Sequence, residues 1–307
     1  MTKRALIVVG SSNTDMILKM DRIPRPGETI IGGEFVTAAG GKGANQAVAA
    51  ARAGGQVTFV ARVGRDMFGD RAMEGFKADE INVDFVVRDD ASPSGVALIF
   101  VGANGENSIG VASGANGHLS PQDVLRAKGA FQQAAVLVMQ LETPLETVNA
   151  AARLGTEAGL RVILNPAPAQ PLPDDLLARL FLLTPNESEA QLLTGVAVTD
   201  EASAEEAAGI LRKRGVRNVI ITMGARGALV SGRDGSGFVP GHKVNAVDTT
   251  AAGDVFNGAL AVALAEGKTL MDAAAFGSAA AAVSVTRMGA QSSVPTRADI
   301  EGLINRR

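Results

Sequence analysis

Short apolar runs alternate along the chain with longer stretches in which alanine and other apolar residues recur at helical spacing. The runs ALIVVG, VTFVARVG, AVLVMQ, RVILNPAP, FLLTPNE and NVIITMG are rich in β-branched residues, and most precede a helical pattern such as GANQAVAAARAG. This alternation is typical of parallel βαβ units in a layered α/β fold. Because the strands are almost continuously apolar, we expect helices on both faces of a mostly parallel central sheet, in a three-layer α-β-α sandwich.

Two segments interrupt this rhythm. Residues 16–37 and 94–111 have the pattern of short strands with Pro-Gly and Asn-Gly turns and no helix between them. We predict that they form one small β-sheet inserted in the main unit, where it would act as a lid. The chain has no long low-complexity linker and no internal repeat, so we expect one α/β domain over residues 1–307.

Composition narrows the class of protein. The 307 residues are 46% apolar, which is enough for a substantial core. The 29 basic and 32 acidic side chains leave a net charge of −3, so overall charge favours neither nucleic acid nor an anionic membrane as a partner. The sequence contains no cysteine, which excludes disulfides, thiolate zinc sites and cysteine nucleophiles. Tryptophan and tyrosine are also absent from it, so stacking platforms for single-stranded nucleic acid are not available in number.

Targeting and metal-binding patterns are weak. The apolar run Ala5 to Val9 is shorter than the apolar region of a signal peptide, and the alanine-rich stretch Ala273 to Val285 is too short to span a bilayer. We therefore expect a soluble, cytoplasmic protein. The two histidines, His118 and His242, cannot supply a histidine-rich metal site, and we expect both in surface loops.

A glycine-rich stretch, GGKGANQ at residues 40–46, opens a predicted helix. It nearly matches the dinucleotide pattern G-x-G-x-x-G, but Gln46 takes the place of the third glycine and the motif does not follow the first strand. Approach of a small ligand to the glycine backbone fits better, with Asn45 and the exposed N–H groups of the helix as donors to hydroxyl groups. An ordinary glycine-rich helix entry is the alternative.

Polar residues follow several predicted strands. Asn13 and Asp15 come after the first strand, where they could bind sugar hydroxyls or simply form a turn. Glu142 also follows a strand. Asn186 and Glu189 lie three residues apart on one helical face, so they could hold a water-coordinated Mg²⁺ near phosphates or form an N-cap and surface pair. Residues 222–227 suit a turn that passes close to a nucleotide, although a plain hairpin explains them too.

Two regions together carry a family resemblance. GGKGANQAVAA and DTTAAGDVFNGAL resemble the two signature regions of the ribokinase, or phosphofructokinase-B-type, sugar kinase family. The likeness covers nearly the whole chain through NTD, PGET, GVALIFV, QLETPLE, NPAPA, TPNESEA, ITMGARG and TRMGAQSSVP. It implies phosphoryl transfer from ATP to O5 of ribose, with Mg²⁺ and K⁺ as cofactors and a homodimer paired through the lid sheets. The exposed edges and apolar faces of a small sheet also favour such pairing.

The resemblance implies a role for individual residues. Asp254 would be the base and a substrate contact, and Ala251, Ala252 and Gly253 would form an anion hole. The implied ribose contacts are Asn13, Asp15, Gly41, Lys42, Gly43, Asn45 and Glu142. The implied ATP site contains Asn186, Thr222, Met223, Gly224, Ala225, Arg226, Gly227 and Gly253, with Ser278 near the adenine. The implied K⁺ ligands are the side chains of Asp248 and Ser293 and the backbone carbonyls of Thr250, Ser284, Arg287 and Gly289.

Two of these residues depart from the family pattern. Thr250 stands where an apolar β-branched residue is common, although a carbonyl ligand survives that change. Ser278 stands where relatives often carry a larger polar residue, so this departure bears on nucleotide selectivity and not on the sugar chemistry.

The signature around Asp254 has a physical explanation. A helix N-terminus exposes unpaired N–H groups and partial positive charge, and the small residues at 251–253 let phosphate oxygens reach it. Asp254, in the first helical turn, could then accept the proton of the attacking hydroxyl. An aspartate that merely stabilises the helix is the alternative for this residue taken alone.

Two other functions compete with a sugar kinase. A nucleoside kinase of the same fold would be expected to stack the base on aromatic residues, which are scarce in this sequence. A catalytically silent sugar-binding regulator would keep Asn13 and Asp15 but lose the base or the anion hole, and both are intact here.

Overall fold

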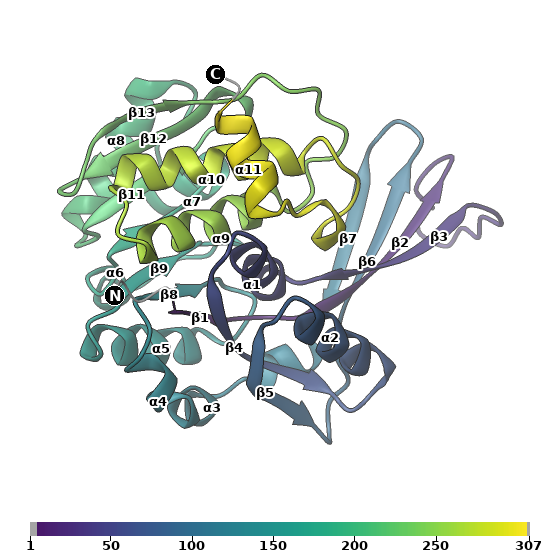
Figure 1. Ribbon diagram of the computed structural model, residues 1–307. Coiled ribbons are helices and arrows are strands. Elements are labelled where there is room, and N and C mark those ends of the chain that lie inside the picture. Colours follow the sequence, from purple (N-terminus) through teal and green to yellow (C-terminus); the bar gives the residue numbers. More distant parts are fainter. Residues whose placement is uncertain (1–4, 306–307) are drawn as a thin grey trace.

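The computed structural model describes residues 5–305, and its centre is a nine-stranded sheet (Figure 1). The strands are parallel apart from β12 and β13, which form an antiparallel edge. In spatial order the strands are β13 (Gly237–Pro240), β12 (Gly227–Gly232), β11 (Asn218–Thr222), β10 (Leu182–Leu183), β9 (Arg161–Leu164), β8 (Val136–Met139), β1 (Ala5–Val9), β4 (Gln56–Gly64) and β5 (Asn82–Asp89).

Helices cover both faces of this sheet, as the continuous apolar strands predicted. Successive residues of β1 point to opposite faces: Leu6 and Val8 belong to one hydrophobic core, and Ile7 and Val9 belong to the other. On the first face lie α1 (Lys42–Arg52), α2 (Met67–Ala78), α9 (Ala252–Ala265), α10 (Leu270–Ser284) and α11 (Arg297–Ile304). On the second face lie α3 (Pro121–Arg126), α4 (Lys128–Phe131), α5 (Leu145–Glu157), α6 (Asp174–Leu177), α7 (Glu187–Thr194) and α8 (Glu201–Lys213). The predicted three-layer sandwich is therefore confirmed.

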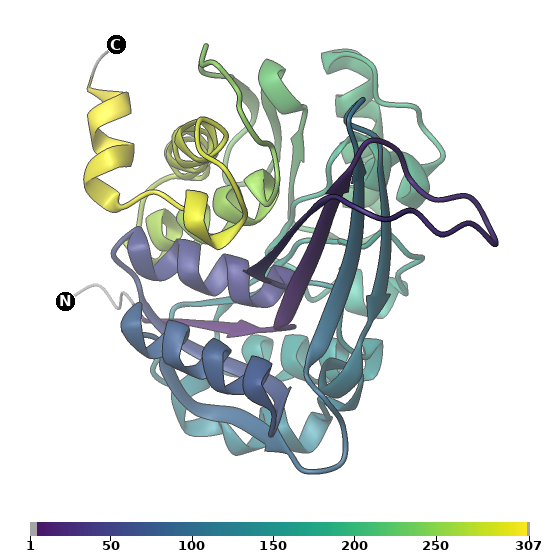
Figure 2. The same ribbon diagram turned by 90° about the vertical axis from the view of Figure 1, so that its right-hand side faces the viewer.

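A second, four-stranded sheet projects from the main body, and we call it the lid sheet (Figures 1 and 2). Its spatial order is β3 (Glu34–Gly40), β2 (Asn13–Met20), β6 (Gly95–Gly102) and β7 (Asn107–Ala112). The central pair β2 and β6 is parallel, and the outer pairs are antiparallel. The inserted sheet was predicted, but its strands extend beyond residues 16–37 and 94–111.

The extension corrects one local interpretation. Asn13 and Asp15 do not form a turn, because β2 begins at Asn13 and both residues pair with β3 and β6. β1 ends at Val9 and β2 begins at Asn13. The backbone N–H and C=O groups from Asn13 onward are therefore hydrogen-bonded in the lid sheet instead of in a turn. Residues 1–4 and 306–307 of the predicted 1–307 domain lie outside the described residues.

The two histidines differ in their surroundings. His118 ends the short 3₁₀ helix η1 (Gly114–His118) and is exposed, as expected. His242 follows β13 in a loop but is only half-exposed, because it lines a cavity described below. Within residues 5–305, every helix is too short or too polar to cross a bilayer.

Candidate active site

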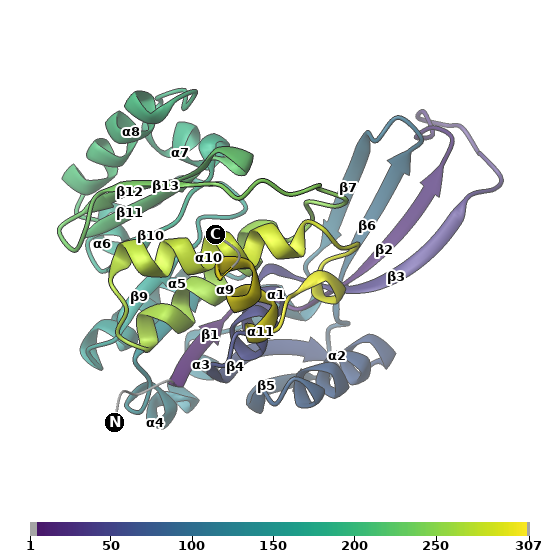
Figure 3. The same ribbon diagram turned by 45° about the horizontal axis from the view of Figure 1, so that its top comes forward.

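The carboxyl ends of the parallel strands and the N-termini of α1 and α9 meet at one place below the lid sheet (Figure 3). α1 and α9 pack closely because Gly258 has no side chain: a Cβ there would lie 2.6 Å from Cβ of Ala49 and 2.6 Å from the Gln46 carbonyl oxygen. This contact brings the two signature regions together across the fold.

The N-terminus of α1 is held by groups from other elements. Glu142 accepts hydrogen bonds from the backbone N–H of Lys42 at 2.9 Å and from Oγ of Ser11 at 2.5 Å. Ser11 in turn accepts the N–H of Ala44 at its carbonyl and that of Gly43 at its hydroxyl. These N–H groups were predicted to donate to a ligand, but they are already used within the protein. Glu142 therefore orients α1 whatever else it binds.

Gly41 and Gly43 are required here by close packing. Gly41 has φ of 89°, and a Cβ at this residue would lie 2.7 Å from the backbone nitrogen of Asn13. A Cβ at Gly43 would lie 2.4 Å from the backbone nitrogen of Ser11. The glycines thus let α1 begin directly against the segment that links β1 to the lid sheet.

Four carboxylates and one ammonium group interact in this region. Burial, together with the negative charges of Glu142 and Asp254, raises the pKa of Asp15 to about 6. Burial alone would lower the pKa of Lys42, but the charges of Asp254, Glu142, Glu189 and Asp15 outweigh it and raise that pKa. Lys42 is therefore a fixed cation among carboxylates, a setting in which a polar substrate can exchange hydrogen bonds with both kinds of group.

Asn13 is oriented by a residue that sequence reasoning missed. Asn116, in η1, donates from Nδ2 to Oδ1 of Asn13 at 2.7 Å and accepts the Ser12 N–H at 2.8 Å. Asn13 is 7% exposed and Asn116 is 1% exposed. The amide of Asn13 is therefore fixed before any ligand arrives.

Asp254 lies in the first turn of α9 and is 6% exposed. Its Oδ2 accepts a hydrogen bond from Nδ2 of Asn45 at 3.0 Å, and its Oδ1 accepts one from Nε2 of Gln46 at 2.9 Å. Burial raises the pKa of Asp254, while Lys42 and the two amide donors act against that rise. A buried carboxylate with a raised pKa is suited to taking a proton.

The N-terminus of α9 is open to a ligand. No side chain among the described residues caps this helix. Ala251, the residue before it, has φ of 60°, which is the left-handed region that alanine rarely adopts. A Cβ at Gly253 would meet no atom within 4 Å. Ala251, Ala252, Gly253 and Asp254 line a cavity of about 190 Å³, so the helix N-terminus faces empty space of the kind that anions occupy.

Asn186 and Glu189 line the same cavity and form a reciprocal cap on α7. Oδ1 of Asn186 accepts the Glu189 N–H at 2.8 Å, and Glu189 accepts the Asn186 N–H at 2.9 Å. The N-cap alternative from the sequence is therefore present. The Glu189 carboxylate still borders the cavity, and a cation there would favour its ionised form against the burial that raises its pKa.

A second cavity, of about 270 Å³, adjoins the first and shares Thr222, Thr249, Ala252 and Gly253 with it. Gly224, Ala225 and Ser278 also line it, as predicted for a nucleotide site. Sequence reasoning missed the other lining residues, which are Gly241, His242, Val244, Ala246, Phe256, Ala281, Ala282 and Val285. Its walls are mainly aliphatic side chains and backbone, with Phe256 and His242 as the aromatic members.

Three residues of the predicted 222–227 nucleotide loop are absent from the described lining of this cavity. Met223 is 2% exposed and belongs to the hydrophobic core. Arg226 turns outward to bind Glu187 at 3.0 Å and the Thr199 carbonyl. Gly227 has φ of 124° and packs against β13, where a Cβ would meet the Val239 carbonyl oxygen. Alternating directions along a tight turn explain why only part of the loop faces the cavity.

The implied K⁺ ligands are partly assembled. Oδ1 of Asp248 accepts the Thr250 N–H at 2.9 Å and the Thr250 hydroxyl at 2.6 Å, and Oδ2 accepts the Gly289 N–H at 2.8 Å. Ser293 is buried and donates to the Ala290 carbonyl. The Ser284 carbonyl accepts the Arg287 N–H at 3.0 Å, and the Arg287 side chain pairs with Asp299. One carboxylate with hydroxyl and carbonyl oxygens fits a hard cation, although the Thr250 hydroxyl also uses that carboxylate.

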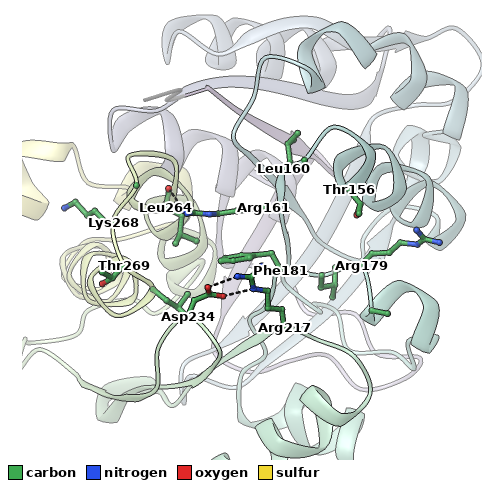
Figure 4. A pocket seen from close by; sticks show the side chains of 15 residues that line it. Thr156, Leu160, Arg161, Arg179, Phe181, Arg217, Asp234, Leu264, Lys268 and Thr269 are labelled. Atoms are coloured by element: carbon green, nitrogen blue, oxygen red, sulfur yellow. Dashed lines mark hydrogen bonds and ion pairs between the residues drawn. The ribbon is translucent and has the colours of Figure 1, made fainter. Parts of the chain in front are cut away.

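A larger cavity, of about 680 Å³, lies at the opposite end of the parallel strands (Figure 4). Arg217 binds Asp234 through two contacts of 2.8 Å, and Arg161 donates to the Leu264 carbonyl at 2.7 Å. Both guanidinium groups also lie 5.4 Å from the centre of the Phe181 ring. Both guanidinium groups thus have partners within the protein. Ligands of open α/β sheets bind at the carboxyl ends of the strands, so size does not mark this cavity as the active site.

Known proteins match this chain along nearly its whole length. The profile of the pfkB family carbohydrate kinases matches residues 3–297. Ribokinase from Haemophilus influenzae is 46% identical over 295 residues, which cover 96% of this chain and 96% of that protein. Deoxyribokinase from Salmonella typhi is 40% identical over 292 residues, which cover 95% of each. The structure of Arabidopsis thaliana ribokinase complexed with ribose and ATP matches with a TM-score of 0.89 and 32% identity, covering 97% of this chain and 98% of that one.

Proposed function

The chain belongs to the pfkB family of carbohydrate kinases, and we propose that it transfers the γ-phosphoryl group of ATP to O5 of ribose. The observation that carries this proposal is the position of Asp254. Its carboxylate lines the cavity at the N-terminus of α9 and is close enough to Asp15, Lys42 and Glu142 to interact with their charges. A general base placed between a hydroxyl-binding cluster and an anion-binding helix end suits phosphoryl transfer to an alcohol.

The sugar would lie between the lid sheet and α1. Asp15 and Glu142 offer carboxylate acceptors and Lys42 offers a donor, so a polyhydroxylated ligand can satisfy both. Asn13, Gly41, Gly43 and Asn45 are the further ribose contacts that we propose from the family resemblance. The lid sheet would cover the sugar and exclude water while the phosphoryl group moves, because β2 carries Asp15.

The nucleotide would extend from the anion hole into the 270 Å³ cavity. Its phosphates would meet the N–H groups of Ala251 and Gly253 and pass the small side chain of Ala252, whose own N–H donates to the Thr249 carbonyl at 3.2 Å. Its base would lie among Ser278 and the aliphatic wall. In the transfer step O5 attacks the γ-phosphorus, Asp254 accepts the O5 proton, and the bond to the ADP leaving group breaks. The helix N-terminus stabilises negative charge on the phosphoryl oxygens during this step.

We also propose Mg²⁺ and K⁺ as cofactors. Glu189 and Asn186 border the phosphate cavity but bind each other, so a contact to Mg²⁺ through water fits them better than direct ligation. When bound, Mg²⁺ would neutralise phosphate charge. Asp248, Ser293 and the carbonyls of Thr250, Ser284, Arg287 and Gly289 are the proposed K⁺ ligands.

We further propose a homodimer and a cytoplasmic location, where ATP is available. The dimer proposal rests on one face of the lid sheet, where Ile109 and Val111 are each more than half exposed and Val36 is 37% exposed. Apolar side chains on a projecting four-stranded sheet are a surface that a second copy can cover.

The test is a coupled assay of ADP formation with ribose, deoxyribose and adenosine as separate acceptors. We expect ribose to give the largest kcat/KM, and phosphorus NMR of the product to show a phosphate ester at O5. A larger kcat/KM with deoxyribose would indicate a deoxyribokinase. A larger kcat/KM with adenosine would indicate a nucleoside kinase. Tight ribose binding without ADP formation would indicate a silent sugar-binding regulator.

A further inference from the structure

A chain of buried amides begins at Asp254 and leads away from the substrate region. Gln46 donates from Nε2 to Oδ1 of Asp254 at 2.9 Å and to Oδ1 of Asn165 at 3.1 Å. Gln140 donates from Nε2 to Oε1 of Gln46 at 2.6 Å. Gln46 is 0% exposed, Gln140 is 1% exposed and Asn165 is 7% exposed, so water does not replace these contacts.

A backbone carbonyl sets the direction of this chain. Nδ2 of Asn165 donates to the carbonyl oxygen of Thr184 at 3.1 Å, and that carbonyl can only accept. The side-chain oxygen of Asn165 must therefore face Gln46, and Gln46 must turn its NH₂ group toward both Asn165 and Asp254. The reversed Gln46 amide would place its oxygen against two other oxygens.

The orientation of the Gln140 amide carries an energetic cost. Its Oε1 is buried without a hydrogen-bond partner. It lies against Gly10, where a Cβ would sit 2.2 Å from that oxygen, so the glycine backbone closes this side of the oxygen. A buried acceptor without a partner is unfavourable. The unpaired oxygen is the consequence of directing the Gln140 NH₂ group to Gln46.

The other oxygen of Asp254 faces a second oriented amide. Asn45 donates to Oδ2 from Nδ2, while its own Oδ1 accepts a hydrogen bond from Nε2 of Gln291 at 3.3 Å. Each carboxylate oxygen of Asp254 thus receives an amide donor. Donors on both sides stabilise the ionised carboxylate and oppose its protonated form.

The charged groups around Asp254 come from four other elements. Lys42 at the start of α1 favours the ionised form. Glu142 after β8, Asp15 on β2 and Glu189 on α7 are negative and oppose it, as does burial itself. Lys42 is the one cation named here that favours ionised Asp254, whereas three carboxylates and burial oppose it. The ionised state of Asp254 therefore depends on its amide donors.

We propose that Gln46, oriented by Asn165 and Gln140, is a positioning residue that keeps Asp254 ionised and aimed, so that it can accept the sugar proton. This inference rests on the proposed kinase function. It gives a role to the residue that takes the third glycine's place in the glycine-rich motif. After transfer the proton resides on Asp254, and the two amide donors favour its release to solvent, which restores the base for the next turnover.

Gln46→Met, which keeps the side-chain length but removes the donor, is the central test. The measurements are kcat and the ribose KM from about pH 5 to 9. We expect kcat to fall about 10- to 100-fold, as for loss of one hydrogen bond to a charged group, with the ribose KM nearly unchanged. The acidic limb of the kcat profile should move up by about one to two pH units. Gln46→Glu, which replaces the donor with a carboxyl group, should move it at least as far.

Two further variants keep the test interpretable. Gln140→Met removes the unpaired oxygen, so it should fold well and shift the acidic limb in the same direction by less. Gln133→Glu makes the Gln46→Glu change at an exposed position and should leave the profile unchanged. Variants that melt normally and keep the wild-type acidic limb would overturn the inference, whatever their kcat. A wild-type protein inactive on every sugar tested would instead overturn the proposed function. In that case the pH dependence of unfolding, compared between wild type and Gln46→Met, would still test whether Gln46 favours the ionised form of Asp254.

Discussion

Asn45 and Asp254 are 209 residues apart in the sequence, and Nδ2 of the first lies 3.0 Å from Oδ2 of the second. The contact joins the N-terminal region of α1 to that of α9. It therefore ties the sugar side of the proposed active site to the base and the anion hole. The predictions below separate the contributions of these parts.

Asp254→Asn should lower kcat about 10²- to 10⁴-fold while the affinities for ribose and MgATP change little, because the amide cannot accept the O5 proton. The new NH₂ group must face either Asn45 or Gln46, which costs about 1–3 kcal/mol, but loss of a buried charge offsets this. We therefore expect a melting temperature close to that of wild type. Steady-state kinetics and a thermal melt provide the check.

Asp272→Asn is the matched control for this substitution. Asp272 also lies in the first turn of a helix, α10, but it is exposed. If Asp254 only stabilised its helix, the two variants would behave alike. A normally melting Asp254→Asn protein with turnover within about threefold of wild type would place the base elsewhere.

Gly253→Ala should impair the enzyme without harming the fold. A Cβ at this residue enters the cavity rather than the protein, and alanine in a helix is favoured over glycine by up to about 1 kcal/mol. We expect equal or higher stability and a raised KM for MgATP. Gly209→Ala in α8, where a Cβ also meets no atom within 4 Å, should give the stability gain alone. Unchanged MgATP kinetics would show that phosphates do not approach Gly253.

The sequence predicted the layers and the helix starts because both depend on local pattern. The run from Leu6 to Val9 is apolar at every position, as expected of a strand covered on both faces. The small residues before Asp254 indicated a ligand at the start of α9, and this helix start does border a cavity.

The surroundings of the base could not be predicted in the same way. Gln46 meets Gln140 and Asn165 over separations of 94 and 119 residues, and each of these amides looks like an ordinary polar residue in its own segment. Met223 and Arg226 show the opposite error, because their position in the sequence suggested a place in the nucleotide site that they do not have. They are neighbours of cavity-lining residues in the chain, but the tight turn directs them into the core and toward solvent.

Asp15→Asn should stabilise the ligand-free protein at pH 8. The folded-state pKa of Asp15, about 6, is above the ordinary aspartate value of 3.8, so ionisation costs folding free energy as pH rises from about 4 to above 6. That cost reaches about 3 kcal/mol at most and disappears at low pH. Denaturant unfolding should therefore favour the variant at pH 8 but hardly at pH 4, while ribose affinity falls. Asp84→Asn, at an exposed position of β5, is the control. A pH-independent difference would contradict this assignment.

Replacing K⁺ with tetramethylammonium should lower kcat severalfold, since the organic cation is too large for the oxygens around Asp248. Asp248→Asn should lose this dependence, because the site loses its negative charge. Asp175→Asn, at an exposed position of α6, should keep the wild-type response. Equal turnover in the two wild-type buffers would remove the K⁺ site from the proposal.

Ile109→Lys should dissociate the proposed dimer. Ile109 pairs with Ile99, Ile99 with Ile17, and Ile17 with Val36, so these four side chains form one apolar row across the lid sheet. Ile17 is two residues from Asp15, and alternation along β2 therefore places the row on the face that carries this proposed ribose contact. In the single chain, Ile109 is 56% exposed and Val36 is 37% exposed. A second copy that covers the row would also close the sugar site.

Leu98→Lys supplies the matched control, because Leu98 is 51% exposed but adjacent to Ile99 on β6 and so points to the opposite face. Light scattering at micromolar concentration should show a monomer for Ile109→Lys and a dimer for wild type and Leu98→Lys. The Ile109→Lys monomer should also bind ribose more weakly, since its sugar site loses the covering copy. If Leu98→Lys alone dissociates, the other face of the lid sheet is the interface, and a monomeric wild type would refute the dimer altogether.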